Sequence, residues 1–344
     1  MKRQRSLFII SCLSLCAAAP SGCHSTGYRD PITALPTIAD VPGTADDQPY
    51  GPWHRVTDGE IGEDLFPAPL PDGSGVVFAS NRHSEYFKLY FQAEPAGHVV
   101  RQITHGPGHD VHPAVAPDGV RVAFASNRTG DWRLYVAAHL EDRSPKRLSD
   151  EEVAEIHPRW SPDGRSLVYS RLSPVSGQWE VWIRDLEGAA RRITEGLFPE
   201  IHPDGDRVVF QRPRRRGDMW YSIWTVALDG TRETEIVSGQ HHGVTHPSWS
   251  ADGQWIVYST ASGDGFEAGA RGTPPGGSGA RTVGRDEAGT TRGRDLYMIR
   301  VDGLHERRLT FQDAPEWGPV WARDGWVYFC AEEGGTTALW RLRP

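Results

Sequence analysis

The stretch from Ile156 to Arg171, IHPRWSPDGRSLVYSR, decides the fold, because the chain repeats its pattern. Six Asp-Gly pairs each follow a proline that stands five residues before the aspartate. The aspartates are Asp72, Asp118, Asp163, Asp204, Asp252 and Asp324, and the prolines are Pro67, Pro113, Pro158, Pro199, Pro247 and Pro319. A repeat of roughly 40–50 residues with strand patterns on both sides of a turn is typical of a β-propeller.

The residues around each Asp-Gly pair indicate four short strands in every repeat. The first strand carries the proline, whose missing N–H suits the unpaired edge of a sheet. The Asp-Gly turn leads into a second strand that ends on an aromatic residue. A third strand pairs an aliphatic with an aromatic residue in all six copies: Leu89-Tyr90, Leu134-Tyr135, Val181-Trp182, Ile223-Trp224, Leu296-Tyr297 and Leu339-Trp340.

The fourth strand is missing from the last repeat, which ends at Pro344. A spare copy, Arg55-Val56-Thr57, precedes the first repeat. Pairing this N-terminal strand with the last blade would remove an open edge of the kind that invites aggregation. The sequence therefore predicts an all-β fold over residues 51–344: a six-bladed β-propeller of four-stranded blades, closed by the N-terminal strand.

The N-terminus has the features of a lipoprotein-type signal peptide over residues 1–22. A basic segment, Met1 to Arg5, precedes the apolar segment Ser6 to Ala19. Ser21-Gly22-Cys23 then resembles the lipobox of bacterial lipoproteins, which makes Cys23 the predicted lipidation site. The alternative is ordinary secretion with Cys23 as an incidental thiol.

Two further segments are predicted to lie outside the regular fold. Residues 23–50 are rich in proline and lack periodicity, which is typical of a flexible tether. Residues 261–293 form a glycine-rich insertion in the fifth repeat, and its composition indicates disorder.

Charge and hydropathy limit the partners. The net charge of −8 argues against nucleic acid, because phosphate binding requires a basic surface. Beyond the N-terminus no apolar run reaches the length of about 18 residues that a membrane span requires. We therefore expect contact with the membrane only through the lipid anchor, and we expect a monomer.

The repeats HPAVAPDG at 112–119, HPRWSPDG at 157–164 and HPSWSADG at 246–253 resemble those of the TolB-type propeller. The resemblance implies a protein of the bacterial cell envelope, held on the periplasmic side of the outer membrane by its anchor. A secreted or soluble periplasmic protein is the alternative. The same repeats are similar to those of oligogalacturonate lyases and of the propellers of prolyl-oligopeptidase-type peptidases. A peptidase would also need a Gly-x-Ser-x-Gly elbow, which the sequence lacks.

The loops that enter the first strands are acidic. They carry twelve carboxylates and no lysine or arginine. A rim of this kind would attract a cation or the basic segment of a protein or peptide partner. The alternative is a solvated rim that keeps the protein soluble. The residues predicted to contact a partner are Asp64, Asp110, Glu151, Glu152, Glu155 and Glu316.

Histidine precedes the proline in three repeats, as His112, His157 and His246. Converging on the propeller axis, these side chains could hold a divalent cation in the channel. The alternative is a structural hydrogen bond from each ring to a neighbouring backbone. The other three repeats lack the histidine, which excludes a symmetric site. No other cofactor is expected.

These observations leave two classes of function open. The first is a non-catalytic binding or scaffold module, a lipid-anchored propeller that presents an acidic face to a partner in the envelope. The second is a metal-dependent carbohydrate-active enzyme, similar to oligogalacturonate lyases, that uses the channel histidines. An acidic rim would repel a polyanionic uronate, so the sequence favours the binding module, with no catalytic residue assigned.

Overall fold

The computed structural model describes residues 53–59, 61–93, 99–149, 152–213, 221–239, 242–262, 294–311 and 314–344. The predicted signal peptide, Cys23 and the tether lie outside the described residues, as do Glu151 and positions 263–293 of the predicted insertion. Ala261 and Ser262, which the sequence assigned to that insertion, instead end a strand. Among the described residues, no helix has the length and hydropathy needed to cross a membrane.

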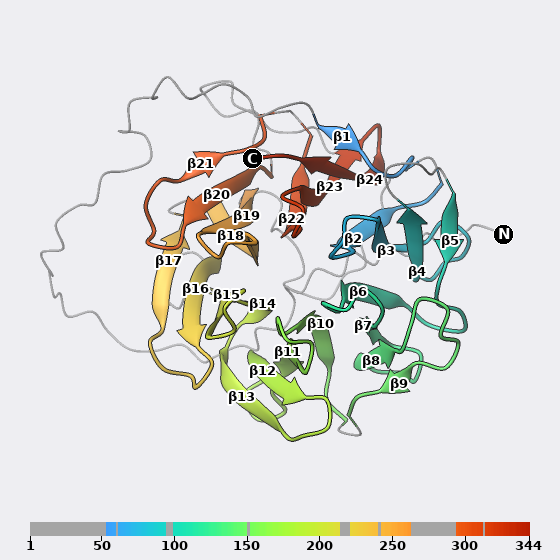
Figure 1. Cartoon of the computed structure of the whole chain (residues 1–344), viewed down its shortest axis with the longest axis horizontal. Helices are drawn as coiled ribbons and strands as arrows, with labels where there is room; N and C mark the ends of the chain where they lie inside the picture. The colour runs from blue at the N-terminus through green and yellow to red at the C-terminus, as the bar shows by residue number, and fades with distance from the viewer. Residues whose placement is uncertain are drawn as a thin grey trace, which may run out of the picture.

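The described strands form six four-stranded antiparallel sheets arranged as the blades of a ring (Figure 1). From the axis outward, blade one contains β2 (Asp64–Pro69), β3 (Gly75–Ser80), β4 (Lys88–Ala93) and β5 (Val100–Gln102), and blade two contains β6 (Asp110–Val115), β7 (Val122–Ser126), β8 (Arg133–Ala137) and β9 (Lys146–Arg147). Blade three contains β10 (Glu155–Trp160), β11 (Ser166–Leu172), β12 (Trp179–Asp185) and β13 (Ala190–Glu195), and blade four contains β14 (Leu197–Ile201), β15 (Arg207–Pro213), β16 (Tyr221–Ala227) and β17 (Thr234–Ser238). Blade five contains β18 (His242–Trp249), β19 (Trp255–Ser262), β20 (Leu296–Arg300) and β21 (Arg307–Arg308).

Blade six joins the two ends of the propeller. It contains β22 (Glu316–Trp321), β23 (Val327–Glu333) and β24 (Thr336–Leu342), and its outer strand is β1 (His54–Arg55). Arg55 is paired with Trp340, and the N–H of Leu339 donates a 3.0 Å hydrogen bond to Thr57 Oγ1. The predicted six-bladed fold and its closure by the N-terminal strand are confirmed.

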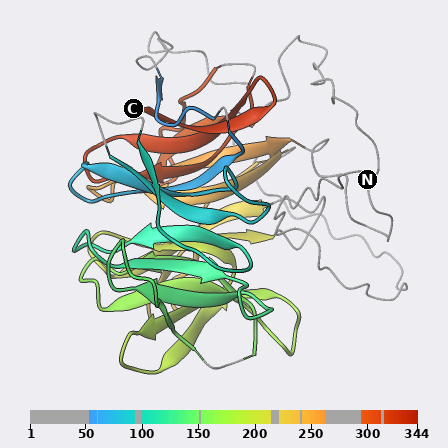
Figure 2. The ribbon, with the colours of Figure 1, turned by 90° about the vertical axis from the view of Figure 1, so that its right-hand side faces the viewer.

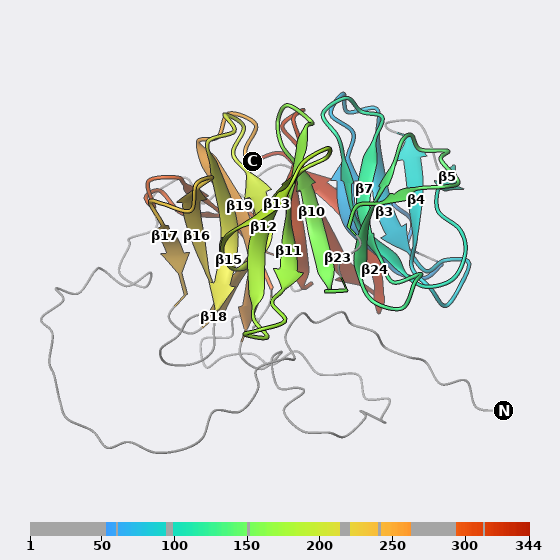
Figure 3. The same ribbon diagram turned by 90° about the horizontal axis from the view of Figure 1, so that it is seen from below.

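The core lies between blades that pack face to face around the ring (Figures 2 and 3). The aromatic residues predicted to end the second strands fill it, each with at most 1% of its surface exposed: Phe78, Phe124, Tyr169, Phe210, Tyr258 and Tyr328. Tryptophan side chains form hydrogen bonds between neighbouring blades at their inner edges. Trp160 Nε1 donates to the carbonyl of Ala114 at 2.9 Å, and Trp249 Nε1 donates to that of Glu200 at 3.2 Å.

Every innermost strand is irregular at the residue that precedes the proline. The pairing between the first and second strands shifts register there in all six blades. The residue has a positive φ in each case: Phe66 57°, His112 51°, His157 53°, Phe198 51°, His246 55° and Gly318 62°. A residue before proline ordinarily prefers extended backbone, so this repeated left-handed conformation is not evident from the sequence pattern. It directs the side chains of five blades toward the axis, and blade six has Gly318 at this position.

The topology gives the ring two faces. The loops that enter the innermost strands lie on one face with the connections between second and third strands, and we call this the loop face. The Asp-Gly turns lie on the other face with the connections between third and fourth strands, and we call this the turn face. Candidate sites occur on both.

Candidate functional site

Aromatic and imidazole rings close the centre of the channel. The rings of successive blades touch: Phe66 to His112 at 4.2 Å between centroids, His112 to His157 at 4.0 Å, His157 to Phe198 at 3.7 Å and Phe198 to His246 at 4.0 Å. Gly318 supplies no ring in blade six and leaves a gap beside a cavity of about 40 Å³. Such a space admits about one water molecule.

The three predicted metal-ligating histidines are therefore brought together around the axis, but as part of a ring of touching side chains. His157 and Phe198 are stacked, and the other pairs are tilted or edge-on. His112 and His157 are 5% and 4% exposed. Burial lowers the pKa of all three imidazoles, that of His246 to about 3, so the rings are neutral at pH 7. The buried Nδ1 atoms of His112 and His246 have no hydrogen-bond partner.

A neutral imidazole nitrogen is a suitable metal ligand. Within the described ranges, however, no three His, Cys, Asp or Glu side chains are grouped closely enough to hold a metal ion. The predicted hydrogen bond from each ring to a neighbouring backbone is not observed for His112 or His246 either. The metal-binding role of the histidines stays a prediction.

The predicted acidic rim is partly turned inward. Asp64 and Asp110 are fully buried at the start of their strands. Arg82 donates to both oxygens of Asp64 at 2.8 and 2.9 Å, and Asp110 accepts bonds from Arg128 at 2.8 Å and from Lys88 at 3.1 Å. The charges of these two carboxylates are thus neutralised within the protein.

A short sequence supplies these cations. Arg82 and Arg128 each end a Ser-Asn-Arg triplet placed after the second strand. In the triplet the serine hydroxyl accepts a bond from the arginine Nε, at 3.2 Å in blade one and 3.0 Å in blade two. The asparagine Oδ1 accepts from the backbone of the loop before the innermost strand, at 2.7 and 2.6 Å. The spacing of 18 residues from aspartate to arginine in both repeats is the signal that sequence reasoning missed.

Glu155 and Glu316 are also buried, at 1% and 0% exposure, and each accepts a hydrogen bond from a hydroxyl. Ser149 Oγ donates to Glu155 at 2.8 Å, and Thr310 Oγ1 donates to Glu316 at 3.1 Å. Burial and the nearby Asp295 raise the pKa of Glu316 to about 9, so this side chain is a neutral carboxylic acid at pH 7.

The accessible acidic groups of the loop face are therefore a different set from the four buried carboxylates. Glu152 is exposed as predicted, whereas Asp64, Asp110, Glu155 and Glu316 offer no surface that a partner could touch directly. Glu63 and Glu332 are exposed. Partial desolvation of the Glu63 carboxyl, together with the proximity of Glu332, raises the pKa of Glu63. The partner-binding role of the rim stays a prediction, and only its exposed members can carry it.

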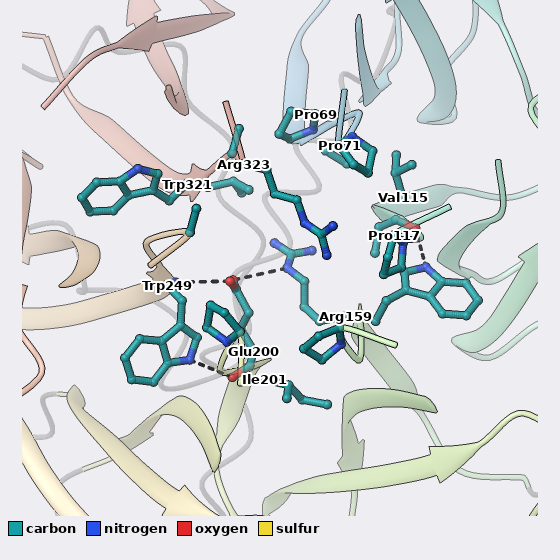
Figure 4. A pocket seen from close by; sticks show the side chains of 18 of the residues that line it. Pro69, Pro71, Val115, Pro117, Arg159, Glu200, Ile201, Trp249, Trp321 and Arg323 are labelled. Carbon is teal, nitrogen blue, oxygen red and sulfur yellow. Dashed lines mark hydrogen bonds and ion pairs between the residues drawn. The ribbon is translucent and has the colours of Figure 1, made fainter. Parts of the chain in front are cut away.

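A hollow lies on the turn face. It is a cup of about 470 Å³ around the axis, enclosed by the residues that flank the six Asp-Gly turns (Figure 4). Prolines and three tryptophans make most of its wall: Pro67, Pro69, Pro71, Pro117, Pro162, Pro203, Trp160, Trp249 and Trp321. The sequence analysis did not identify this cup.

Three charged side chains enter the cup. Arg159 lies between it and the small cavity beneath, since it lines both. Its Nε is 3.8 Å from Glu200 Oε2, and Glu200 Oε1 accepts the backbone N–H of Trp249 at 3.2 Å. Arg323 extends from blade six toward Arg159, and Figure 4 shows both guanidinium groups near the middle of the cup.

The charged residues occupy repeat positions that are uncharged elsewhere. The position after the proline is Arg159 in blade three and Glu200 in blade four, whereas the other blades have Ala68, Ala114, Ser248 and Val320. The position before the Asp-Gly pair is Arg323 in blade six and proline or alanine in the other five. An alignment of the six repeats shows Arg159, Glu200 and Arg323 as the charged exceptions at these positions, and this is the signal that could have found them.

Comparison with known proteins adds a family and a fold. The family described as "TolB beta propeller domain" matches residues 54–251, which are more than half of the chain. An uncharacterized protein of Agrobacterium fabrum is 28% identical over 126 residues, which cover 35% of this chain and 41% of that protein. A protein of Bacillus subtilis named an uncharacterized peptidase is 27% identical over 199 residues, 52% of this chain and 30% of that protein. The chain thus spans less than half the length of these relatives.

Solved structures share the propeller at low identity. TolB from Acinetobacter baumannii has a TM-score of 0.58 at 18% identity, over 76% of this chain and 57% of that one. Oligogalacturonate lyase from Vibrio parahaemolyticus has a TM-score of 0.53 at 17% identity, over 84% of this chain and 92% of that one. Similarity at this level establishes a common fold and no common activity.

Proposed function

We propose that this chain, which belongs to the TolB beta propeller family, is a non-catalytic binding module of the cell envelope. The proposed partner is a protein or peptide with a basic segment, bound at the loop face. Lipidation at Cys23 would hold the propeller, as a monomer, on the periplasmic side of the outer membrane. A secreted or soluble periplasmic protein is the alternative location.

One observation carries the proposal: Arg82 and Arg128 of the loop face are committed to buried aspartates, while the carboxylates of Glu63 and Glu332 stay exposed. Arg82 and Arg128 each point inward to a buried aspartate. Glu63 and Glu332 lie exposed and close enough that the second raises the pKa of the first. Arg294 is a described cation close to Glu332, and it supplies one positive charge beside two carboxylates. The pair therefore favours a further cation, which a lysine or arginine of a partner would supply.

The test is the salt dependence of binding to a lysine-rich peptide. Exposed charge pairs weaken as salt rises, so we expect affinity to fall steeply between about 50 mM and about 300 mM salt. At low salt, the double variant Glu63→Gln, Glu332→Gln should bind the peptide more weakly than the wild type. Glu187→Gln, at an exposed residue of the turn face, is the matched control. Binding that is independent of salt and of both loop-face carboxylates would contradict the proposal.

A metal-dependent carbohydrate-active enzyme is the second candidate, favoured by the three histidines that converge on the axis. Its test is metal analysis of the purified protein, followed by the double variant His112→Ala, His157→Ala. A stoichiometric divalent metal that this variant loses would support the enzyme over the binding module. Purified wild-type protein that neither contains nor takes up a divalent metal would remove this candidate.

A further inference from the structure

The cup on the turn face has the properties of a ligand site, and the function proposed for the loop face does not use it. Its volume of about 470 Å³ falls within the range of about 300–1,000 Å³ that is usual for ligand pockets. Its wall is mostly apolar, with a few charged groups at the centre, which is the usual composition of such pockets. The ring of aromatic and imidazole side chains lies beneath it, with the small cavity that Arg159 also lines.

The charges in the cup do not balance. Arg159 and Arg323 contribute two positive charges, and Glu200 contributes one negative charge. Glu200 accepts the Trp249 backbone N–H and lies within ion-pair distance of Arg159. Arg323 has no ion-pair partner within the described part of the chain, and Figure 4 shows its side chain and that of Arg159 both extending toward the middle of the cup. Two guanidinium groups that converge without a shared anion form a site for an anion.

The size and lining of the cup indicate which class of anion it would bind. A carboxylate matches the planar donor pattern of arginine and can accept from both guanidinium groups at once. Prolines and the half-buried Trp321 around it offer contact area to apolar side chains, as in other surfaces that bind extended peptides. The Glu200 carboxylate, partly exposed on the same floor, can accept a backbone N–H. A peptide has such donors, whereas a fatty acid has none.

We propose that the cup binds the C-terminal end of an apolar peptide, with the free α-carboxylate held between Arg159 and Arg323. The last side chains of the peptide pack against Trp321 and the prolines of the wall. Arg323 sets specificity for the carboxylate, and Glu200 accepts an N–H of the peptide backbone. The propeller thus has a second binding face, independent of the acidic loop face.

The experiment uses the full-length protein, isothermal titration calorimetry and three probes. The first probe is the N-acetylated peptide Ala-Pro-Leu with a free carboxylate, the second is its C-terminal amide, and the third is octanoate. The test variant is Arg323→Gln. Arg323 is exposed and has no ion-pair partner in the described part of the chain, so its replacement should not disturb folding. Its matched control is Arg143→Gln, at an exposed arginine of the turn face outside the cup.

We expect the acid form of the peptide to bind at least about tenfold more tightly than the amide, because hydrogen bonds to charged groups are the stronger ones. Arg323→Gln should reduce affinity for the acid by a similar factor and leave the amide unchanged, and Arg143→Gln should change neither. Equal binding of acid and amide, or binding of neither, overturns the carboxylate site. Octanoate bound as tightly as the peptide overturns the peptide as occupant. None of these outcomes bears on the salt test of the loop face.

Discussion

Replacing Glu316 by glutamine should change how the stability of the propeller depends on pH. The Glu316 side chain is fully buried at the start of β22, where Thr310 Oγ1 donates to one of its oxygens. Its other oxygen has no hydrogen-bond partner, and no cation is bonded to it as Arg82 is to Asp64. Burial, with Asp295 nearby, raises the pKa of this carboxyl from 4.5 to about 9.

The sign of the effect follows from the difference between the two states. The folded protein binds this proton more tightly than the unfolded chain, so the stabilisation is complete below about pH 4.5 and is lost as the pH rises toward about 9. The loss amounts to about 1.4 kcal/mol per pH unit. Glutamine does not titrate. Between about pH 5.5 and about pH 7.5, the free energy of unfolding of the wild type should therefore fall by about 3 kcal/mol relative to Glu316→Gln.

Urea unfolding followed by tryptophan fluorescence at these two pH values measures the difference. Glu187→Gln, at an exposed residue, controls for changes in net charge and should track the wild type at both pH values. If the gap between Glu316→Gln and the wild type is the same at both, the buried carboxyl is not neutral in the folded protein and the reasoning fails.

Three further predictions concern the stability of the propeller, and each is measured as the free energy of unfolding in urea. Trp160→Phe removes the donor to the Ala114 carbonyl of the next blade and should cost about 1 kcal/mol; an unchanged value would mean that this bond adds nothing. Thr57→Val leaves the buried N–H of Leu339 without its hydroxyl acceptor and should cost about 1–3 kcal/mol, whereas a neutral result would contradict the stabilising role of the closure. Gly318→His should fold with a cost of about 1 kcal/mol, because the site is open and five other residues adopt its φ; an insoluble variant would refute this.

Part of the candidate site was predictable from residues alone and part was not. The histidines were placed at the axis correctly, because a fixed offset from the Asp-Gly turn puts them at one level of the ring. Their packing in a ring of touching side chains depends on a left-handed residue before proline, such as His112, which runs against the usual preference of that position. The charged floor of the cup was missed, because Arg159 and Glu200 occupy a position that is uncharged in the other repeats.

The sequence by itself determined the number of blades and the way the ring closes. Turn chemistry, the alternation of strands and the spare strand before the first repeat are local signals, and they recur with the same spacing in each copy. The tertiary structure alone decided which charges face the solvent. Asp64 counts as acidic in the sequence, yet in the fold Arg82 neutralises it and burial removes it from any partner. The charge that a surface presents depends on which side chains of neighbouring loops meet, and that is a property of the assembled ring.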